Sequence, residues 1–477
     1  MENATHEEEP LRGAPVRRML SSRLSSDMTG QVTMARAFTT IMASTSLEPE
    51  QVNARPILVT GFLYFKKPLD ISRLRQVLKE RLMEIPRFRS VLQLKAEGKK
   101  KKTIFVEHNP DSFSMEELVQ DAPSVKNQKD VNTFVSKVYA ENMGSKLPPW
   151  RAYIFNNMDD GRSCFLLVVD HVIGDGVSLV ATLMSVLDDN DTDASLAKAQ
   201  TAAPRKRLAK PPSCFANVAA KVCGCLDGVF GDQLPGDPPN RLKLKDHRNP
   251  GLVKSVSQSE AIPLAKIKEV AAKLDNCTVN DVLMTILTLT AQAYFEKFEP
   301  TTLTQKLRAI FLISLRPAGV DVLNEAYFGN QFSSGKIRFP IHLKDPLQIF
   351  RDCKKQIDFV KLSPAPLIAS KLTGVVAHTS LIDAKGKMDA VLDIYGKCTA
   401  MLSNVMGPAS EARFCGQPLD DLNFYALSPI GLYFGILSYN GKVSMGAVTD
   451  QACEPDASRL TGEWVGAFER LYKSVIG

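Results

Sequence analysis

The sequence predicts an α/β protein built from two domains, and both its length and its apolar patterns support this prediction. At 477 residues, the chain is longer than a single hydrophobic core sustains, so two units of roughly 200 residues are expected. Helical and strand-like patterns alternate in both halves, which a stretch rich in Asp, Ala, Lys, Pro and Gly separates. The predicted divisions are a disordered tail (1–30), an N-terminal domain (31–190), a crossover linker (191–252) and a C-terminal domain (253–477).

The N-terminal half shows the periodicities of helices and strands in turn. Asp70 precedes apolar residues that recur at helical spacing, and it is well placed to cap that helix. The run at 164–169 is almost wholly apolar, as expected of a central strand with both faces covered. The predicted elements are a helix from Leu74 to Ile85, a hairpin over 91–106, a helix over 131–143 and strands over 151–155 and 164–169.

The same alternation continues after the linker and predicts a second α/β unit. A strand-like run leads into two amphipathic helical patterns, and the pair Asn440-Gly441 is typical of a tight hairpin turn. The predicted elements are strands over 253–262, 307–314 and 398–405, helices over 264–274, 279–298 and 455–475, and the hairpin at Asn440-Gly441.

Composition and charge restrict the classes of function. Apolar residues make up 44% of the chain and charged residues 23%, which is typical of a globular protein. The formal charge of +7 is partly concentrated at 99–102 and 205–210, and such clusters are typical of solvated loops, acidic membrane surfaces or phosphorylated ligands. The chain has no zinc-finger spacing or RNA-binding signature, so we expect no nucleic acid partner.

The cysteines and the apolar runs indicate the compartment. Nine cysteines are scattered without a regular framework, which predicts reduced thiols in the cytoplasm. The Cys223-Gly224-Cys225 pair lacks further ligands nearby, so we expect no metal site. No signal peptide or membrane-spanning run is present. Residues 215–230 have a weak amphipathic pattern that fits either packing onto a domain or contact with a membrane surface.

One histidine stands where α/β proteins commonly place their chemistry. The heptad Asp170-His171-Val172-Ile173-Gly174-Asp175-Gly176 directly follows the apolar strand and precedes a helical pattern over 177–187. Loops at the ends of buried strands often carry functional side chains. Taken alone, the heptad fits two interpretations equally, a histidine held by a backbone carbonyl and a neutral imidazole that acts as a general base.

Three further segments distinguish between these interpretations, because together with the heptad they occur in a characteristic order along the chain. In that order, the four segments are Pro148-Pro149-Trp150, the heptad, Asn280-Asp281 and Ser403-Asn404-Val405-Met406-Gly407-Pro408. Together they resemble the bifunctional wax ester synthase/diacylglycerol acyltransferase family over residues 109–475, and residues 414–448, with Leu427-Ser428-Pro429, resemble that family's C-terminal domain. The resemblance implies two chloramphenicol acetyltransferase-like α/β sandwich domains, with a central tunnel that acyl-CoA enters from one side and the alcohol from the other.

The resemblance also implies roles for residues of the heptad. His171 is the implied general base, which takes a proton from the alcohol and returns it to the departing thiolate. Asp175 has a structural role in the family, and we expect it to pair with Arg316, the alternative being that Arg316 is a surface charge. Gly174 and Gly176 permit a tight loop between strand and helix.

The oxyanion of the tetrahedral intermediate needs hydrogen-bond donors. The matched motifs offer Asn280, Ser403 and Asn404, although Asn280 is equally suited to cap the helix that follows it. The remaining motif neighbours have no assigned role, and they are Trp150, Asp281, Gly407 and Pro408.

Asp170 departs from the family, which usually has a histidine at this position. Because successive strand residues point to opposite faces, we expect Asp170 to face away from the tunnel while His171 faces into it. Its carboxylate has two possible consequences: a raised imidazole pKa and an altered choice of substrate.

The implied reaction moves a long-chain acyl group from acyl-CoA to a fatty alcohol, and to diacylglycerol. A thioester is already activated, so we expect neither a cofactor nor a metal, and the sequence has no Walker loop, His-Glu-x-x-His motif or nucleophile elbow. Two alternatives remain, which are a transferase of the same fold with a small alcohol or amine acceptor, and a non-catalytic protein that binds acyl-CoA or lipid.

Overall fold

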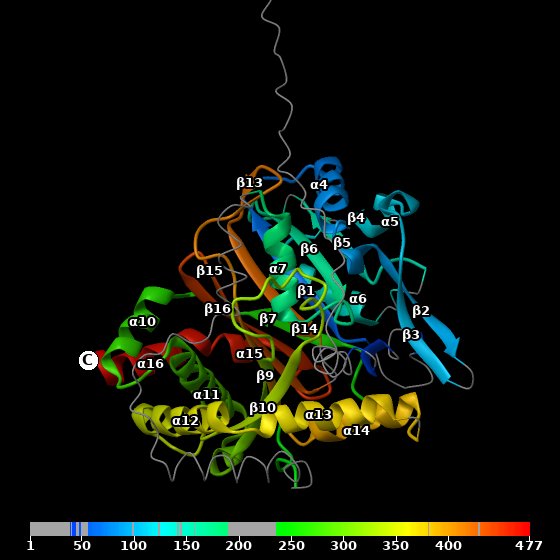
Figure 1. Cartoon of the computed structure of the whole chain (residues 1–477). Helices are drawn as coiled ribbons and strands as arrows, with labels where there is room; N and C mark the ends of the chain where they lie inside the picture. The colour runs from blue at the N-terminus through cyan, green and yellow to red at the C-terminus, as the bar shows by residue number, and fades with distance from the viewer. Residues whose placement is uncertain are drawn as a thin grey trace, which may run out of the picture.

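The computed structural model describes residues 56–188, 235–427 and 430–477, apart from short internal gaps, together with a few positions between 39 and 48. It consists of two main β-sheets with helices packed around them (Figure 1). Several predicted features lie outside the described residues: the tail 1–30, most of the linker, the basic cluster 205–210, the segment 215–230, the Cys223–Cys225 pair and Ser428-Pro429.

The first sheet has five strands in the order β14-β1-β6-β5-β4. Its central strand β6 alternates between two cores, because Phe165 and Val169 pack on one face while Leu166 and Val168 pack on the other. The apolar run that predicted a central strand is thereby confirmed. The strands are β1 (Leu58–Phe65), β4 (Val119–Asp121), β5 (Trp150–Phe155), β6 (Ser163–Asp170) and β14 (Asp421–Leu427).

The second sheet has the order β10-β9-β11-β15-β16-β7, with the short strand β8 paired to β16. One of its faces is covered by helices α10 (Leu264–Lys273), α11 (Val279–Phe298), α12 (Pro346–Leu362) and α16 (Trp464–Ile476), whose apolar residues form the largest core cluster together with those of the sheet. The strands are β7 (Lys254–Gln258), β8 (Ile262–Pro263), β9 (Leu307–Ser314), β10 (Phe332–Phe339), β11 (Ala400–Met406), β15 (Leu432–Tyr439) and β16 (Lys442–Asp450).

The two sheets share a core. Ile310, Met401 and Tyr433 of the second sheet belong to the same buried cluster as Leu166 and Val168 of the first. Between them the chain also exchanges a strand, because β14 comes from the C-terminal half but pairs antiparallel with β1 of the N-terminal sheet. A division of the sequence at the linker does not anticipate this exchange, which ties the two halves together.

Helices are present in the ranges where helical patterns were predicted, but the three helices between residues 346 and 396 were not predicted. Asp70 caps α4 (Ile71–Val77), accepting a hydrogen bond from the backbone N of Ser72 at 2.8 Å, and a π-helical turn (Leu78–Leu82) continues it. No helix among the described residues is long and apolar enough to cross a membrane. The helices are α4 (Ile71–Val77), α5 (Met115–Leu118), α6 (Gln128–Ala140), α7 (Gly176–Val186), α10 (Leu264–Lys273), α11 (Val279–Phe298), α12 (Pro346–Leu362), α13 (Ala365–His378), α14 (Ala384–Gly396), α15 (Ser458–Thr461) and α16 (Trp464–Ile476).

Candidate active site

His171 lies at the junction of the two sheets, directly after β6. Its backbone N donates to the carbonyl of Ile57 at 2.9 Å, and Arg87 donates to the carbonyls of Val172 and Ile173. These bonds fix the path of the loop, so the buried imidazole, 7% exposed, is held between the halves of the chain.

The imidazole lines a pocket whose wall is contributed by both sheets. The pocket encloses about 40 Å³, room for about one to three water molecules. Its lining is mainly apolar, and includes Val59, Leu312, Phe332, Tyr395, Met401, Ser403, Phe424 and Tyr433. A long acyl chain therefore requires side chains of this wall to move. The through-going tunnel stays a prediction.

Asn330 determines which nitrogen of His171 carries the proton. The Asn330 amide donates both of its N–H groups, to the carbonyl of His171 at 2.8 Å and to the hydroxyl of Thr39 at 3.1 Å. Its oxygen therefore faces Nδ1 of His171, 2.9 Å away, and can only accept. Nδ1 must donate, so Nε2 keeps the lone pair that a general base needs.

Burial keeps the imidazole neutral. Removal from water holds the pKa of His171 below its ordinary value of 6.5, although the charge of Asp175 and hydrogen bonds from the ring act in the opposite direction. A neutral ring is the form that accepts a proton.

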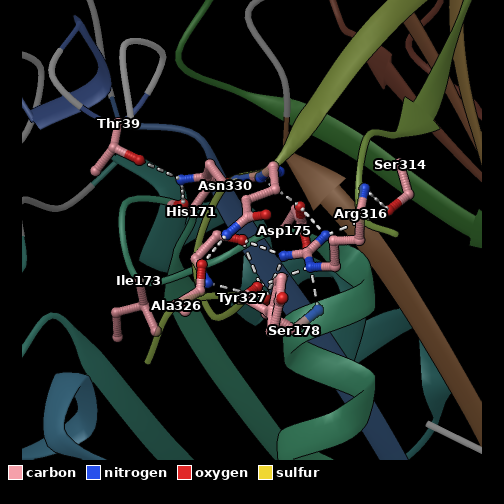
Figure 2. A network of polar contacts seen from close by, with 12 residues as sticks. Thr39, His171, Ile173, Asp175, Ser178, Ser314, Arg316, Ala326, Tyr327 and Asn330 are labelled. Carbon is pink, nitrogen blue, oxygen red and sulfur yellow. Dashed lines mark hydrogen bonds and ion pairs between the residues drawn. The ribbon is translucent and has the colours of Figure 1, made fainter. Parts of the chain in front are cut away.

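Asp175 and Arg316 form the predicted ion pair. Nη1 of Arg316 lies 2.8 Å from Oδ2 of Asp175, and the Arg316 side chain has no exposed surface, so Arg316 is not the surface charge of the alternative interpretation. Asp175 also caps α7 by accepting from the backbone N of Ser178 at 3.0 Å. Figure 2 shows how this pair lies beside the loop that carries Asn330.

The pair fixes Asn330 from both sides. Arg316 donates to the carbonyl of Gly329 at 2.6 Å, and Asp175 accepts from the backbone N of Gln331 at 2.9 Å. Ser178 adds two bonds to Gly329, through its hydroxyl. The geometry of the loop thus rests on the ion pair, which acts on His171 through Asn330.

Among the oxyanion candidates, Ser403 alone belongs to the described lining of the pocket. Its hydroxyl is hydrogen-bonded to Tyr433, whose pKa burial raises, so the phenol stays protonated. Asn404 is the next residue along β11 and is exposed; its amide donates to Asn280 at 3.0 Å. Neither asparagine side chain is part of that lining.

Asn280 does not cap α11 either. Thr278 is the N-cap, and its hydroxyl accepts from the backbone N of Asp281, while the Asp281 carboxylate accepts from the backbone N of Thr278 at 2.9 Å. This reciprocal pair is a capping box. Asp281 is therefore a buried structural residue, because its carboxylate stabilises the start of the helix.

The other motif neighbours are structural. The indole of Trp150 is fully buried and donates to the carbonyl of Phe88 at 2.8 Å. Gly407 directly follows β11, where a Cβ would lie 2.9 Å from the carbonyl of Ser438, and the carbonyl of Pro408 accepts from the backbone N of Asn440. Gly176 begins α7 and lines the pocket beside His171.

Asp170 is buried, and its carboxylate accepts from the backbone N of Val172 at 2.9 Å. It is absent from the described lining of the pocket, as the alternation of strand residues predicts. Burial lowers the pKa of His171, and the charge that opposes this comes from Asp175, so the net rise that the Asp170 charge suggested is not found.

Sequence reasoning did not find Asn330, Ser178 or Tyr433. The one sequence signal for Asn330 was the glycine that precedes it. The structure shows why a glycine is required there, because Gly329 has φ 111° and a Cβ would lie 2.9 Å from the Arg87 guanidinium. A glycine of this kind marks a tightly built loop, but it does not indicate which histidine the next residue contacts.

The arrangement of two sheets with helices around them is a known fold, which solved structures of acyltransferases share. A trichothecene 15-O-acetyltransferase from Fusarium sporotrichioides has this fold, with a TM-score of 0.58 at 8% identity over 92% of this chain and 94% of that one. The wax ester synthase/diacylglycerol acyltransferase from Marinobacter aquaeolei VT8 also has it, with a TM-score of 0.56 at 17% identity, covering 87% of this chain and 94% of the other.

Sequence similarity identifies the family. Residues 45–233 match the wax ester synthase/diacylglycerol acyltransferase catalytic domain, and residues 328–472 match the WS/DGAT C-terminal domain. Wax ester synthase/diacylglycerol acyltransferase 11 of Arabidopsis thaliana is 24% identical over 439 residues, which cover 84% of this chain and 88% of that protein. The chain belongs to the wax ester synthase/diacylglycerol acyltransferase family, as its motifs predicted.

Proposed function

We propose that this chain transfers a long-chain acyl group from acyl-CoA to a fatty alcohol, and to diacylglycerol, with His171 as the general base. The observation that carries the proposal is the hydrogen bond between Nδ1 of His171 and Asn330. It leaves Nε2 unprotonated on a ring that lines an apolar pocket at the junction of the sheets.

The chemistry follows from this tautomer. Nε2 takes the hydroxyl proton as the alcohol oxygen attacks the thioester carbon, and the carbonyl oxygen becomes an oxyanion. Ser403 is the donor placed to stabilise that oxyanion, because it lines the same pocket. When the C–S bond breaks, the imidazolium returns its proton to the CoA thiolate, which leaves ester, free thiol and a neutral histidine.

The chain's own residues account for each of these steps. Asn330 orients the ring, the ion pair of Asp175 and Arg316 holds Asn330, and burial keeps the imidazole neutral. The mainly apolar lining suits an aliphatic chain better than a polar acceptor. Because such acceptors reside in lipid, we place the protein in the cytoplasm, peripherally attached to endoplasmic reticulum or lipid droplets.

A second candidate function has one observation in its favour. The pocket encloses only about 40 Å³, which suits an acceptor smaller than a fatty alcohol unless the wall opens. A transferase of the same fold with a small alcohol or amine acceptor fits that volume.

A substrate panel tests both candidates. Purified protein is mixed with palmitoyl-CoA and hexadecanol, dioleoylglycerol, a short-chain alcohol or a short-chain amine, and free thiol and ester are measured. Thiol release with hexadecanol or dioleoylglycerol supports the proposal, whereas release only with short acceptors supports the second candidate. Binding of palmitoyl-CoA without thiol release from any acceptor would show a non-catalytic lipid-binding protein.

A further inference from the structure

One segment of the surface concentrates the exposed apolar side chains. Seven of the twelve exposed large apolar residues among the described residues fall within 359–382. Isolated apolar residues are normal on a protein surface, but a cluster of this kind marks an interaction site. The seven are Phe359, Leu362, Leu367, Leu372, Val375, Leu381 and Ile382.

Helix α13, at the centre of this segment, presents its larger apolar residues outward. Leu367, Lys371 and Val375 follow each other at four-residue spacing and form one stripe, with Leu372 beside it. Leu367 is 57% exposed and Val375 69%. We call this stripe, with Leu372, the outer face of α13.

The opposite side of α13 is the one that packs on the protein. Pro366, Gly374 and Ala377 are buried there, and Ala377 shares a small core cluster with Met388 and Leu392 of α14. A surface helix normally turns its apolar side to the core and its polar side to water. The outer face of α13 reverses this rule, so its apolar residues do not serve the fold.

The charge of the segment favours an anionic partner. Residues 359–382 contain two lysines, Lys361 and Lys371, and no Asp or Glu. Lys371 is exposed within the stripe of the outer face, while Lys361 lies 3.7 Å from the carboxylate of Asp358. The exposed Asp383 directly follows Ile382, whereas α13 itself carries Lys371 and no carboxylate. Exposed apolar residues around a lysine on such a helix are the pattern of a surface that rests on anionic lipid.

This segment is attached to the wall of the catalytic pocket. The hydroxyl of Ser333 on β10 donates to the carbonyl of Pro366 at the start of α13. The preceding residue, Phe332, lines the pocket, and its ring centroid lies 5.9 Å from that of His171. Tyr395 in the last turn of α14 lines the same pocket. In Figure 1, α13 and α14 lie side by side at the margin of the molecule.

We propose that the outer face of α13, together with Leu381 and Ile382, docks on the surface of a membrane or lipid droplet that carries anionic headgroups. The inference rests on the proposed function, because a lipid-dissolved acceptor gives such docking a purpose. Docking places β10 and α14, which wall the pocket, next to the phase that holds the acceptor.

Vesicle flotation with the full chain tests the docking surface. The probes are vesicles of phosphatidylcholine alone and of phosphatidylcholine with phosphatidylserine. The parent protein should float with the anionic vesicles, and the double variant Leu367→Gln/Val375→Gln should lower this binding about tenfold. Lys371→Glu should weaken binding to anionic vesicles and reduce its dependence on salt.

The matched control is Leu252→Gln/Val253→Gln, which removes two apolar side chains of similar exposure, 42% and 50%, outside the segment. This control should float like the parent. Equal flotation of parent, α13 variant and control would overturn the proposal. So would a parent protein that sediments as a dimer and becomes monomeric in the α13 variant, because the outer face would then bind a second copy. Melting temperatures close to the parent value show that the variants are folded.

Activity separates this inference from the proposed function. Thiol release is measured with palmitoyl-CoA and a water-soluble alcohol, and again with dioleoylglycerol in anionic vesicles. The α13 variant should keep its rate with the soluble alcohol and lose rate with dioleoylglycerol. No thiol release from the parent with any acceptor would contradict the proposed function, while flotation still decides the docking surface. Equal rates of parent and variant on vesicle-borne dioleoylglycerol would contradict the docking role.

Discussion

Oδ1 of Asn330 lies 2.9 Å from Nδ1 of His171, and this contact connects the fold to the chemistry. Asn330 can only accept there, because its two N–H groups are directed to the His171 carbonyl and to Thr39. The ring is thereby held as the tautomer with a free Nε2. The ion pair of Asp175 and Arg316 binds the residues on either side of Asn330, so a structural pair supports the tautomer that the proposed general base requires.

Replacing His171 by alanine should remove most of the turnover and leave the fold intact. The substitution deletes the general base, whose contribution is typically about 10²–10⁴ in rate. Thiol release measures the loss, and circular dichroism and the melting temperature check the fold. His342→Ala is the matched control, because His342 is exposed and should have no effect. Turnover of His171→Ala at the parent rate would refute the assignment of the base.

Asn330→Ala should lower kcat about 10²–10⁴-fold while the KM for acyl-CoA changes little. The ring would lose the contact that selects its tautomer, and a histidine base held in the wrong tautomer loses much of its rate. The control is Asn324→Ala, an exposed asparagine in the same loop. A variant that loses stability but keeps kcat would show that Asn330 only supports the fold.

The acid limb of the pH profile should have its midpoint below 6.5, the ordinary pKa of a histidine. Burial holds the pKa of His171 below 6.5, so protonation should stop turnover only at a pH below 6.5. The profile of kcat/KM for the folded parent checks this. Asn330→Asp should move the limb upward, because a carboxylate beside Nδ1 favours the charged ring. An acid limb of the parent protein with a midpoint above pH 6.5 would contradict the lowering of the His171 pKa by burial.

Asp175→Ala should destabilise the protein by about 3–5 kcal/mol, since it leaves the buried Arg316 guanidinium without its partner. Denaturant unfolding measures the change. Asp389→Ala is the matched control, because the Lys385–Asp389 pair is partly exposed and spans i to i+4, which predicts a loss of only about 0.3–0.5 kcal/mol. A stable but inactive Asp175→Ala protein would contradict the structural role of Asp175.

The local parts of this site could be predicted from the sequence. The apolar run before His171 indicated a central strand, and the loop after it followed directly. The pairing of Asp175 with Arg316 came from the family resemblance, and the structure contains it. The strand and the loop depend on periodicity and on a motif that is continuous in the chain, whereas the ion pair joins residues 141 positions apart and could be expected only from the resemblance.

Other features depend on tertiary placement and left no local pattern. Asn330 lies 159 residues from His171, and nothing around it indicates that contact. Strand β14 resembles any other strand of the C-terminal half until it pairs with β1. For the cap of α11, Thr278 and Asn280 are both suitable residue types two positions apart, and only the helix start distinguishes them.

Ser403→Ala should lower kcat about 10²–10³-fold, if its hydroxyl donates to the oxyanion as its place in the pocket predicts. The effect should fall on kcat with little change in KM, because the oxyanion exists only in the transition state and the intermediate. Asn404→Ala is the control, since Asn404 follows Ser403 on β11, is exposed and bonds to Asn280. This control should reduce turnover little. A larger loss for Asn404→Ala than for Ser403→Ala would reverse the assignment and place the oxyanion on the side of the strand that faces α11.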